Sequence, residues 1–293
     1  KHPWAITFGL VSQLAFLSPP ATAISPSSVA DRQASWRQHQ QLKEESAFKD
    51  LKWRSVGPRF QGGRIETIAV DPKNPSGIYV GAGSGNLWKT VNNGTTWKPI
   101  FEHESTFAMG EVAVSPSNPD ILWLGTGERL MARSSYAGTG IFKSTDGGET
   151  WRNMGLADSH HIGRVIVDPK NPDIVFAAVI GHLYSPNEER GVFKTADGGK
   201  TWSKVLYIDD RTGAIDLVMH PKDPQVLYAT TWEHDRKAWG QTAYGKGCGL
   251  HKTTDAGQTW RRLTKGPPVG DQVGRLGVDV SRSNPDVVYA IAD

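Results

Sequence analysis

Ser144-Thr-Asp-Gly-Gly-Glu-Thr-Trp151 decides the fold, because this stretch returns three more times along the chain. The other copies are Thr90-Val-Asn-Asn-Gly-Thr-Thr-Trp97, Thr195-Ala-Asp-Gly-Gly-Lys-Thr-Trp202 and Thr253-Thr-Asp-Ala-Gly-Gln-Thr-Trp260. In each copy the first hydroxyl and the acidic or amide side chain can hydrogen-bond nearby backbone groups and close a tight turn. The Gly allows a positive φ, and the Trp is expected to return the chain to the next strand and pack on its own sheet. Because each copy does the same local job, we assign a structural role to Asn92, Trp97, Asp146, Trp151, Asp197, Trp202, Asp255 and Trp260.

A second motif precedes each of these turns. It reads IAVDPKNPSGIYVGAG at 68–83, VAVSPSNPDILWLGTG at 112–127, VIVDPKNPDIVFAAVIG at 165–181 and LVMHPKDPQVLYATT at 217–231, and a fifth copy, VDVSRSNPDVVYAIAD, occupies 278–293. The short β-branched runs bounded by Pro, Gly and Asn are typical of strands, and the prolines belong in connections because they lack an N–H donor. The period of about 50 residues is that of four-stranded propeller blades. The sequence therefore predicts an all-β fold, a β-propeller with four complete blades and the start of a fifth.

The repeats also set the predicted domain boundaries. Residues 1–23 are interpreted as a signal peptide, residues 24–50 as a polar linker with a short helix near 35–49, and residues 51–293 as the propeller. Its blades are expected at about 51–104, 105–157, 158–208 and 209–266, with a partial blade at 267–293. We expect the chain to be a fragment whose remaining blades lie in a missing C-terminal region, which leaves an exposed edge strand near 286–292.

The first residues follow the pattern of a secretory signal. Lys1 and His2 give a positive start, residues 5–17 are mostly apolar, and Ala21-Thr-Ala23 fits a cleavage site. The apolar run is too short to cross a bilayer as a helix, so we predict a cleaved signal, an exported protein and no stable membrane span.

Composition excludes several other classes of site. The net charge is +3 without a Lys/Arg block, which argues against a nucleic-acid partner. Cys248 is the single cysteine, so neither an internal disulfide nor a multi-cysteine zinc site can form. His160, His161 and His182 are candidate metal ligands by residue type, but their spacing follows no ligand motif, and we predict no metal and no cofactor.

The repeated turns resemble the Asp-box, or BNR-repeat, superfamily of β-propellers. Together with Trp53-Arg-Ser-Val-Gly-Pro58, Gly62-Gly-Arg-Ile65 and Ser84-Gly-Asn-Leu-Trp-Lys-Thr90, they make residues 50–293 similar to the sortilin-type N-terminal propeller of large exported bacterial proteins, which are often labelled glycosyl hydrolases. Related groups include sialidases, xyloglucan-cleaving enzymes, sortilin-type peptide receptors and a photosystem assembly factor. The resemblance is specific for the fold, while one fold hosts many functions.

Two catalytic motifs of these relatives differ in this chain. Sialidases are expected to carry an early Arg-Ile-Pro, whereas Arg64-Ile65 is followed by Glu66. Xyloglucanases are expected to place their first catalytic aspartate in a stretch that corresponds here to Gly83-Ser-Gly-Asn86, which has no carboxylate.

The predicted ligand face carries the long loops. The Asp-boxes and the DPxNP turns share one face of a propeller, and the opposite face holds the loops 127–136, 181–190 and 232–244. These loops mix charges with aromatic rings, which suits stacking on sugars or gripping a peptide. The simpler alternative is a set of solvated loops whose aromatic rings pack on their own blades. The candidate ligand-binding residues are Glu128, Arg133, Tyr136, His182, Tyr184, Trp232, Glu233, Asp235, Trp239 and Tyr244, with Arg164.

One position of the innermost strands supplies a candidate for catalysis. Aligning the blades on the DPxNP turn puts Glu111, Arg164 and Asp216 at equivalent places near the mouth of the central channel. Glu111 and Asp216 could act as acid and base in glycoside cleavage, or the three could form a structural ion-pair ring between blades. The favoured hypothesis is binding of polysaccharide or polypeptide. The alternatives are a xyloglucanase- or sialidase-like glycoside hydrolase, whose acid and base lie here or in a missing C-terminal part, and a non-catalytic assembly scaffold.

Overall fold

The computed structural model describes residues 27–51 and 64–293, which form two separate units divided at Leu51. The predicted signal peptide at 1–23 and the opening motif at 53–58 lie outside the described residues. The first unit is the helix α1 (Val29–Glu45). It starts earlier than predicted because the Ser28 hydroxyl caps it, accepting a hydrogen bond from the Asp31 N–H at 3.1 Å. No helix among the described residues combines the length and apolarity that a membrane span requires.

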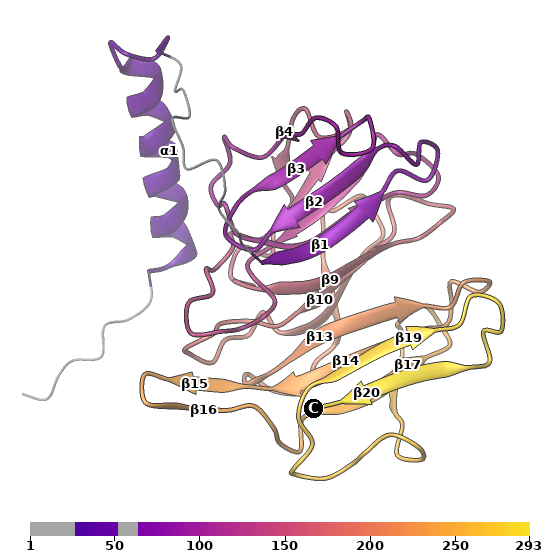
Figure 1. Cartoon of the computed structure of the whole chain (residues 1–293). Coiled ribbons are helices and arrows are strands. Elements are labelled where there is room, and N and C mark those ends of the chain that lie inside the picture. Colours follow the sequence, from indigo (N-terminus) through magenta and orange to yellow (C-terminus); the bar gives the residue numbers. More distant parts are fainter. Residues whose placement is uncertain (1–26, 52–63) are drawn as a thin grey trace, which may run out of the picture. The chain divides into compact units, whose positions relative to one another are not determined.

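The second unit consists of antiparallel sheets that follow one another along the chain (Figure 1). The first sheet contains β1 (Ile65–Val70), β2 (Ile78–Ala82), β3 (Leu87–Thr90) and β4 (Lys98–Pro99). The second contains β5 (Met109–Val114), β6 (Leu122–Thr126), β7 (Ile141–Ser144) and β8 (Arg152–Asn153). The third contains β9 (Ile162–Val167), β10 (Val175–Val179), β11 (Gly191–Thr195) and β12 (Ser203–Leu206).

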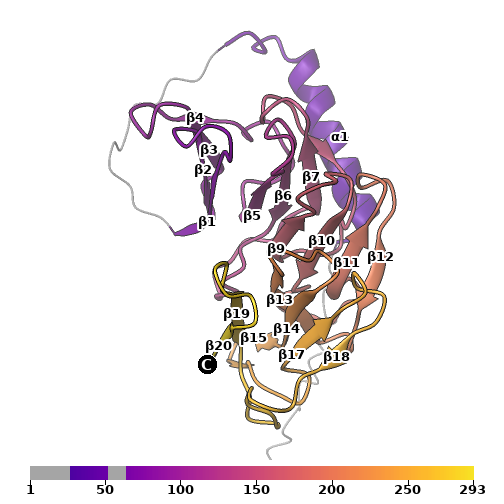
Figure 2. The same ribbon diagram turned by 90° about the vertical axis from the view of Figure 1, so that its right-hand side faces the viewer.

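The fourth sheet contains β13 (Thr212–Met219), β14 (Leu227–Glu233), β17 (Gly249–Thr253) and β18 (Arg261–Arg262). A separate hairpin, β15 (Asp235–Lys237) with β16 (Gly240–Thr242), is inserted after β14. The fifth sheet has two strands, β19 (Leu276–Val280) and β20 (Val288–Ala292). The innermost strands β1, β5, β9, β13 and β19 contact one another in chain order, and Figure 2 shows the sheets fanning out from them. The prediction of four full blades and two strands of a fifth is confirmed.

The three boxes that contain an aspartate form the same set of local hydrogen bonds. In the second blade the buried Ser144 hydroxyl accepts from the Gly148 N–H at 2.9 Å and donates to the Asp146 carboxylate at 2.7 Å. That carboxylate accepts from the N–H and the hydroxyl of Thr150, at 2.9 and 2.5 Å. Gly148 has a φ of 93°, which a residue with a side chain rarely adopts. The Gly147 N–H also donates to the Asp120 carbonyl at 2.9 Å, which joins the box to the DPxNP turn of its blade and puts both on one face.

The tryptophan of a box also reaches the preceding blade, a contact that the sequence did not predict. Trp151 donates from Nε1 to the Ile100 carbonyl at 2.8 Å, and Trp202 donates to the Met154 carbonyl at 2.8 Å. The Trp202 ring meets the Trp123 ring edge-on, with 6.0 Å between their centroids. The box tryptophan is therefore a staple between blades as well as part of its own turn.

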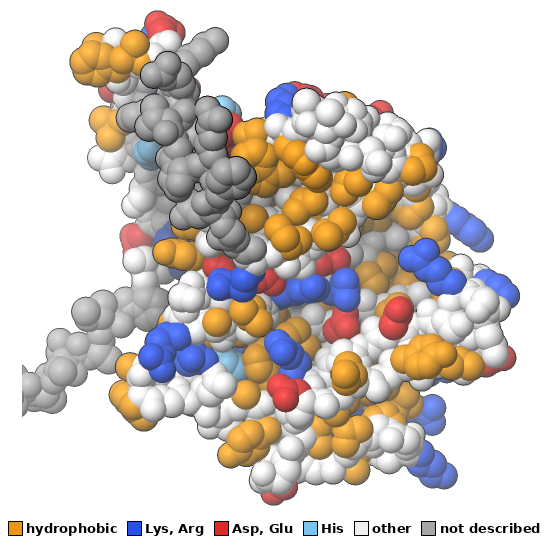
Figure 3. Space-filling model, in the orientation of Figure 1, with side chains coloured by type: hydrophobic (Ala, Val, Ile, Leu, Met, Phe, Trp, Pro, Cys, Tyr) orange, Lys and Arg blue, Asp and Glu red, His pale blue; other side chains and the backbone are white. Residues whose placement is uncertain are grey.

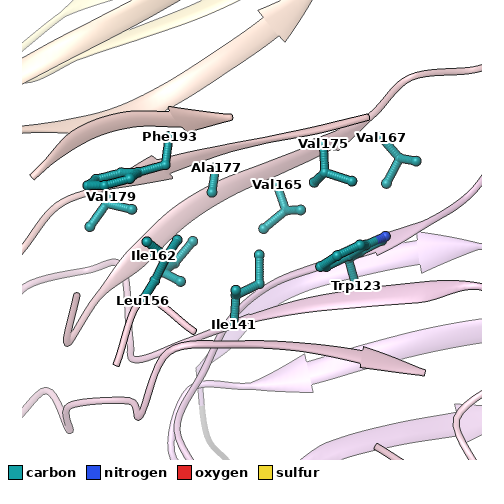
Figure 4. Packing of buried hydrophobic residues seen from close by; sticks show 10 residues of the cluster. All are labelled: Trp123, Ile141, Leu156, Ile162, Val165, Val167, Val175, Ala177, Val179 and Phe193. Carbon is teal, nitrogen blue, oxygen red and sulfur yellow. The ribbon is translucent and has the colours of Figure 1, made fainter. Parts of the chain in front are cut away.

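Apolar side chains fill the space between successive blades. Figure 4 shows the cluster between the second and third blades, where Trp123 and Ile141 face Val165, Val175 and Ala177. All five are buried. Removing such side chains from water is the main favourable term in folding, so the interfaces between blades hold this fold together.

Candidate functional site

A β-bulge interrupts the inner strand of every complete blade at the same place. The pairing of inner and second strands skips one residue in each blade. The skipped residues are Glu66, Gly110, Gly163 and Ile215, and the residues that follow them are Thr67, Glu111, Arg164 and Asp216. Bulges bend a strand and redirect side chains. They turn these equivalent positions toward the neighbouring inner strand.

The redirected side chains link the blades. Arg164 donates to Glu111 Oε1 at 3.0 Å and to Asp216 Oδ1 at 2.8–2.9 Å. The Asp216 carboxylate also accepts from the Val278 N–H of the fifth blade at 3.0 Å, as the Thr67 hydroxyl does from the Val112 N–H of the second blade at 3.2 Å. The three residues that the repeat placed at equivalent positions therefore lie together.

The electrostatics of this cluster follow from its burial. Burial raises the pKa of Glu111 above its ordinary value, although the Arg164 and Arg129 guanidinium groups oppose the shift. Burial also disfavours the charged form of Arg164, but the Glu111 and Asp216 carboxylates outweigh it and raise the pKa of Arg164. Arg164 therefore stays charged and holds both carboxylates.

A cavity of about 580 Å³ opens beside this cluster. Its charged lining residues are Glu66, Arg129, Arg164, Asp216, Arg275 and Asp293, and its apolar ones are Leu130, Ile215, Leu276, Ile291 and Ala292. Figure 3 shows acidic and basic side chains gathered near the middle of the molecular face that is turned toward the viewer. The volume is in the range of small-ligand sites, and apolar walls with a few convergent charges are typical of such sites.

Glu66 and Arg129 were not predicted, and they extend the charged cluster. Arg129 lies 3.7 Å from Glu66 Oε2 and 3.5 Å from Glu111 Oε2, and Arg64 lies 3.5 Å from Glu66 Oε1. Burial raises the pKa of Glu66, with Arg129 and Arg64 acting in the opposite direction. Glu66 directly precedes Thr67, which is equivalent to Glu111, Arg164 and Asp216 in the other blades. This place in the repeat is the sequence signal that could have identified Glu66.

Four of the predicted aromatic residues have exposed rings. Tyr136, Tyr184 and Tyr244 are about half exposed, and Trp239, at the tip of the β15–β16 hairpin, is 87% exposed. Tyr136 packs on Phe107 with 5.0 Å between the centroids, and the Tyr184 hydroxyl donates to the Arg133 carbonyl at 2.7 Å. In Figure 1 the hairpin extends on the side opposite to the DPxNP turns, which is the loop-rich face.

Trp232, a candidate ligand-binding residue of the 232–244 loop, is buried in the structure. Its ring is only 5% exposed and packs in an apolar cluster with Ile215 and Leu276, and its Nε1 donates to the Ala243 carbonyl at 2.8 Å. The Arg275 guanidinium lies over this ring, 5.4 Å from its centroid. Trp232 therefore supports a cavity arginine and is a core residue.

The predicted loop acids are bound within the protein. Glu128 is fully buried, and it accepts from the Tyr136 N–H at 2.9 Å and from Arg64. Glu233 accepts from the Gly247 N–H at 3.0 Å, and Asp235 pairs with Arg211 and Lys237 at 3.0 and 2.9 Å. None of the three is among the residues that line the cavity in the described part of the chain.

Arg190 organises the 181–190 loop, a role that sequence reasoning missed. Only 1% of it is exposed, and burial lowers its pKa to about 10. Its guanidinium donates to the carbonyls of Ile180, His182, Ser185 and Arg211 at 2.7–3.1 Å. His182, predicted as a ligand contact, is buried beside it, with Nδ1 at 2.8 Å from the Ser185 hydroxyl. Nothing in the spacing distinguishes Arg190 from a solvated arginine.

The structure shows where the candidate catalytic residues Glu111 and Asp216 lie, and their role in catalysis stays a prediction. Asp216 lines the cavity, and Glu111 lies behind Arg164 and Arg129. Both carboxylates contact the Arg164 guanidinium, an arrangement that is typical of a structural ion pair between blades.

Comparison with known proteins agrees with this fold. Residues 139–268 match the Sortilin-Vps10 family model, described as sortilin, neurotensin receptor 3. Among curated proteins, the chain is 23% identical over 269 residues to xyloglucanase Xgh74A of Acetivibrio thermocellus, covering 76% of this chain and 29% of that protein. It is 28% identical over 277 residues to a probable oligoxyloglucan-reducing end-specific xyloglucanase of Neosartorya fischeri, covering 78% and 31%.

A solved structure, the GH74 enzyme of Niastella koreensis, matches with a TM-score of 0.55 at 24% identity, over 76% of this chain and 33% of that one. The chain thus spans about a third of the length of the relatives it matches. The repeated boxes, the four-stranded sheets and these likenesses lead to one assignment. The chain is a β-propeller built of Asp-box blades, and over residues 139–268 it is similar to the Sortilin-Vps10 family.

Proposed function

We propose that this propeller is part of an exported protein and binds a polysaccharide chain across its loop-rich face. The observation that carries the proposal is Trp239, which is 87% exposed at the tip of a hairpin inserted on that face. Solvent-exposed aromatic rings offer flat apolar surfaces on which sugar rings can stack. Tyr136, Tyr184 and Tyr244 add further exposed rings on the same face.

Two further observations support the class of ligand and the location. The matched curated proteins include xyloglucanases, whose name states that they act on xyloglucan. Residues 1–23 carry the charge, apolar run and Ala-Thr-Ala site of a secretory signal, which supports export. We also propose that further blades cover β20, where Tyr289 and Ile291 are exposed. Strong hydrogen-exchange protection of both faces and the free edge of β20 in this chain alone would contradict that last point.

The binding proposal is tested by calorimetry with soluble xyloglucan. The whole chain is expected to bind, and Trp239→Ala is expected to weaken binding by roughly tenfold or more. The comparable stacking of a nucleobase on an aromatic side chain contributes about 1–3 kcal/mol. Tyr289→Ala, an exposed aromatic on a strand away from the loops, is the matched control and should bind like the unmodified chain. Equal affinity of Trp239→Ala and Tyr184→Ala with the unmodified chain would exclude this face.

A polypeptide ligand is the outcome that the sortilin match would favour. The match covers residues 139–268, which include the 181–190 and 232–244 loops. Binding of extended peptides, but of no polysaccharide, in the same calorimetric experiment would replace the first proposal with this one.

Glycoside hydrolysis is the second candidate function, and Glu111 is the observation that favours it. A buried carboxyl with a raised pKa is the form that a general acid needs, and Asp216 lies on the other side of Arg164. Release of reducing ends from xyloglucan, lost by roughly 100-fold or more in Glu111→Gln and Asp216→Asn, would support it. Glu149→Gln, at an exposed ion pair with Lys98, serves as the control. Activity that survives both substitutions in folded protein would remove these two residues from catalysis.

A further inference from the structure

Three side chains with metal-ligating atoms meet on the loop-rich face. They are Asp158 and His160, from the connection between the second and third blades, and His182, from the loop after β10. One ligand atom of each lies within 4.8 Å of the others. Asp158 and His160 lie far from His182 in the sequence. The spacing of these residues therefore matches no metal-ligand motif, which is why the sequence predicted no metal.

The distance between two of the three ligand atoms fits a metal ion of ordinary size. His182 Nε2 lies 3.2 Å from Asp158 Oδ1. Zinc bonds to imidazole and carboxylate are about 2.0–2.2 Å long, so two ligands on a tetrahedral site stand about 3.3–3.5 Å apart. The rings of His160 and His182 are stacked face to face, with 3.6 Å between their centroids and 19° between their planes. Because an imidazole nitrogen binds a metal in the plane of its ring, the His160 ring must rotate out of this stack before both rings can direct a nitrogen at one ion.

The surrounding residues hold the ligands in place. The Ser185 hydroxyl lies 2.8 Å from His182 Nδ1, which orients that ring with Nε2 toward Asp158. The Asp158 N–H donates to Glu189 Oε2 at 2.9 Å, and its carbonyl accepts from Asn187 Nδ2 at 2.8 Å. Hydrogen bonds of this kind to the far side of a ligating histidine, and to the segment that carries a ligating carboxylate, are common around protein metal sites.

His160 is fixed by an unusual backbone conformation. Its φ is 54°, in the left-handed region that costs a residue with a side chain about 1 kcal/mol or more. Its carbonyl accepts from the Gly138 N–H at 2.6 Å, a contact with the loop of the second blade. In this turn the His160 imidazole stacks against His182.

We propose that Asp158, His160 and His182 bind a divalent transition metal, with Zn²⁺ as the ion that the donor set suits best. Two imidazoles and one carboxylate are ligands that zinc accepts, and three protein ligands leave a fourth position for water. Asp158 and Glu189 bring negative charge, which offsets the nearby guanidinium of Arg190. The site is independent of the proposed binding of polysaccharide, because no aromatic platform residue belongs to it.

The test uses the whole untagged chain, freed of metal by a chelator and titrated with Zn²⁺ alone. One equivalent is expected to bind, and Co²⁺ in its place is expected to show the visible absorption of a tetrahedral site. His160→Gln and His182→Gln are expected to lower the Zn²⁺ affinity by more than tenfold. Ser185→Ala, which removes only the orienting hydrogen bond, is expected to lower it by roughly tenfold.

The matched control is His103→Ala, because His103 is an exposed histidine in another loop. It should leave both the affinity and the Co²⁺ spectrum unchanged. Stoichiometric Zn²⁺ should also raise the melting temperature of the unmodified chain and not that of His182→Gln. The absence of Zn²⁺ binding by the unmodified chain, or equal affinity in folded His160→Gln and His182→Gln, would overturn the proposal.

Discussion

Arg164 donates a hydrogen bond of 3.0 Å to Glu111 across the interface between the second and third blades. The same guanidinium holds Asp216 of the fourth blade, so one cation of the third blade joins two carboxylates from the blades on either side of it. Glu111 is almost completely buried, and its pKa is already raised by burial. Its charge is therefore tolerated because Arg164 and Arg129 lie beside it.

Arg164→Met is expected to destabilise the propeller by about 3 kcal/mol, since breaking a buried pair leaves an uncompensated charge. The loss should shrink at low pH, where Glu111 becomes protonated, and Glu111→Gln added to Arg164→Met should recover part of it. Urea unfolding monitored by tryptophan fluorescence measures each value. Lys98→Met breaks the exposed pair with Glu149 and should cost at most about 1 kcal/mol. Equal effects of Arg164→Met and Lys98→Met would contradict the assignment.

Ser144→Ala should cost about 1–3 kcal/mol, because it leaves the buried Gly148 N–H without its acceptor. The neighbouring Thr145→Ala, at an exposed position, is the control and should change stability by less than about 0.5 kcal/mol. Both values come from chemical denaturation. If the two variants were equally stable, the hydroxyl of the box would not be what closes the turn.

Asp146→Asn should preserve the fold of the box and remove the part of its stability that is lost in acid. Asn92 occupies this position in the first blade, and its side chain accepts from the Thr96 N–H at 2.9 Å. Hydrogen bonds from Thr150 lower the pKa of Asp146 from its ordinary value to about 2. A depressed carboxylate pKa stabilises the fold above about pH 4, and that contribution disappears as the pH falls toward 2. The stability difference between the unmodified chain and Asp146→Asn should therefore shrink between pH 4 and 2, and a constant difference would refute this explanation.

His251 should make the propeller less stable in mild acid. Burial, assisted by the charge of Arg262, lowers the pKa of His251 from 6.5 to about 4. The unfolded chain then binds a proton that the folded chain does not, so stability falls as the pH drops from about 6.5 to 4, by at most about 1.4 kcal/mol per pH unit for this group. Phe142 and Phe193 hold the corresponding places in the second and third blades.

His251→Phe follows that pattern and should remove this part of the pH dependence, so that the variant gains stability relative to the unmodified chain as the pH falls. His220→Phe, at a half-buried turn position without a pairing strand, is the comparison. Urea unfolding at several pH values between 4 and 7 decides the matter. A stability profile of His251→Phe parallel to that of the unmodified chain would show that His251 does not carry the effect.

The aligned repeats predicted the proximity of Glu111, Arg164 and Asp216, because equivalent positions of neighbouring blades lie side by side in a propeller. They did not predict Glu66, Arg129 and Arg275, which also belong to the charged lining of the cavity. These residues come from a bulge, a loop and a connection, and no period in the sequence places such segments. The burial of Trp232 was missed for the same reason, since its partners Ile215 and Leu276 lie on other strands.

The sequence by itself determined the blade, its strands and its Asp-box turn, because the hydrogen bonds that form the box join residues within five positions of one another, as between Ser144 and Gly148. The tertiary structure alone decided the contacts between blades that do not involve equivalent positions of the repeat. It brings Asp158 to His182, buries Arg190 in a ring of carbonyls and sets Trp151 on the preceding blade. Such contacts join residues tens of positions apart, and their geometry depends on bulges and loop paths that local patterns do not encode.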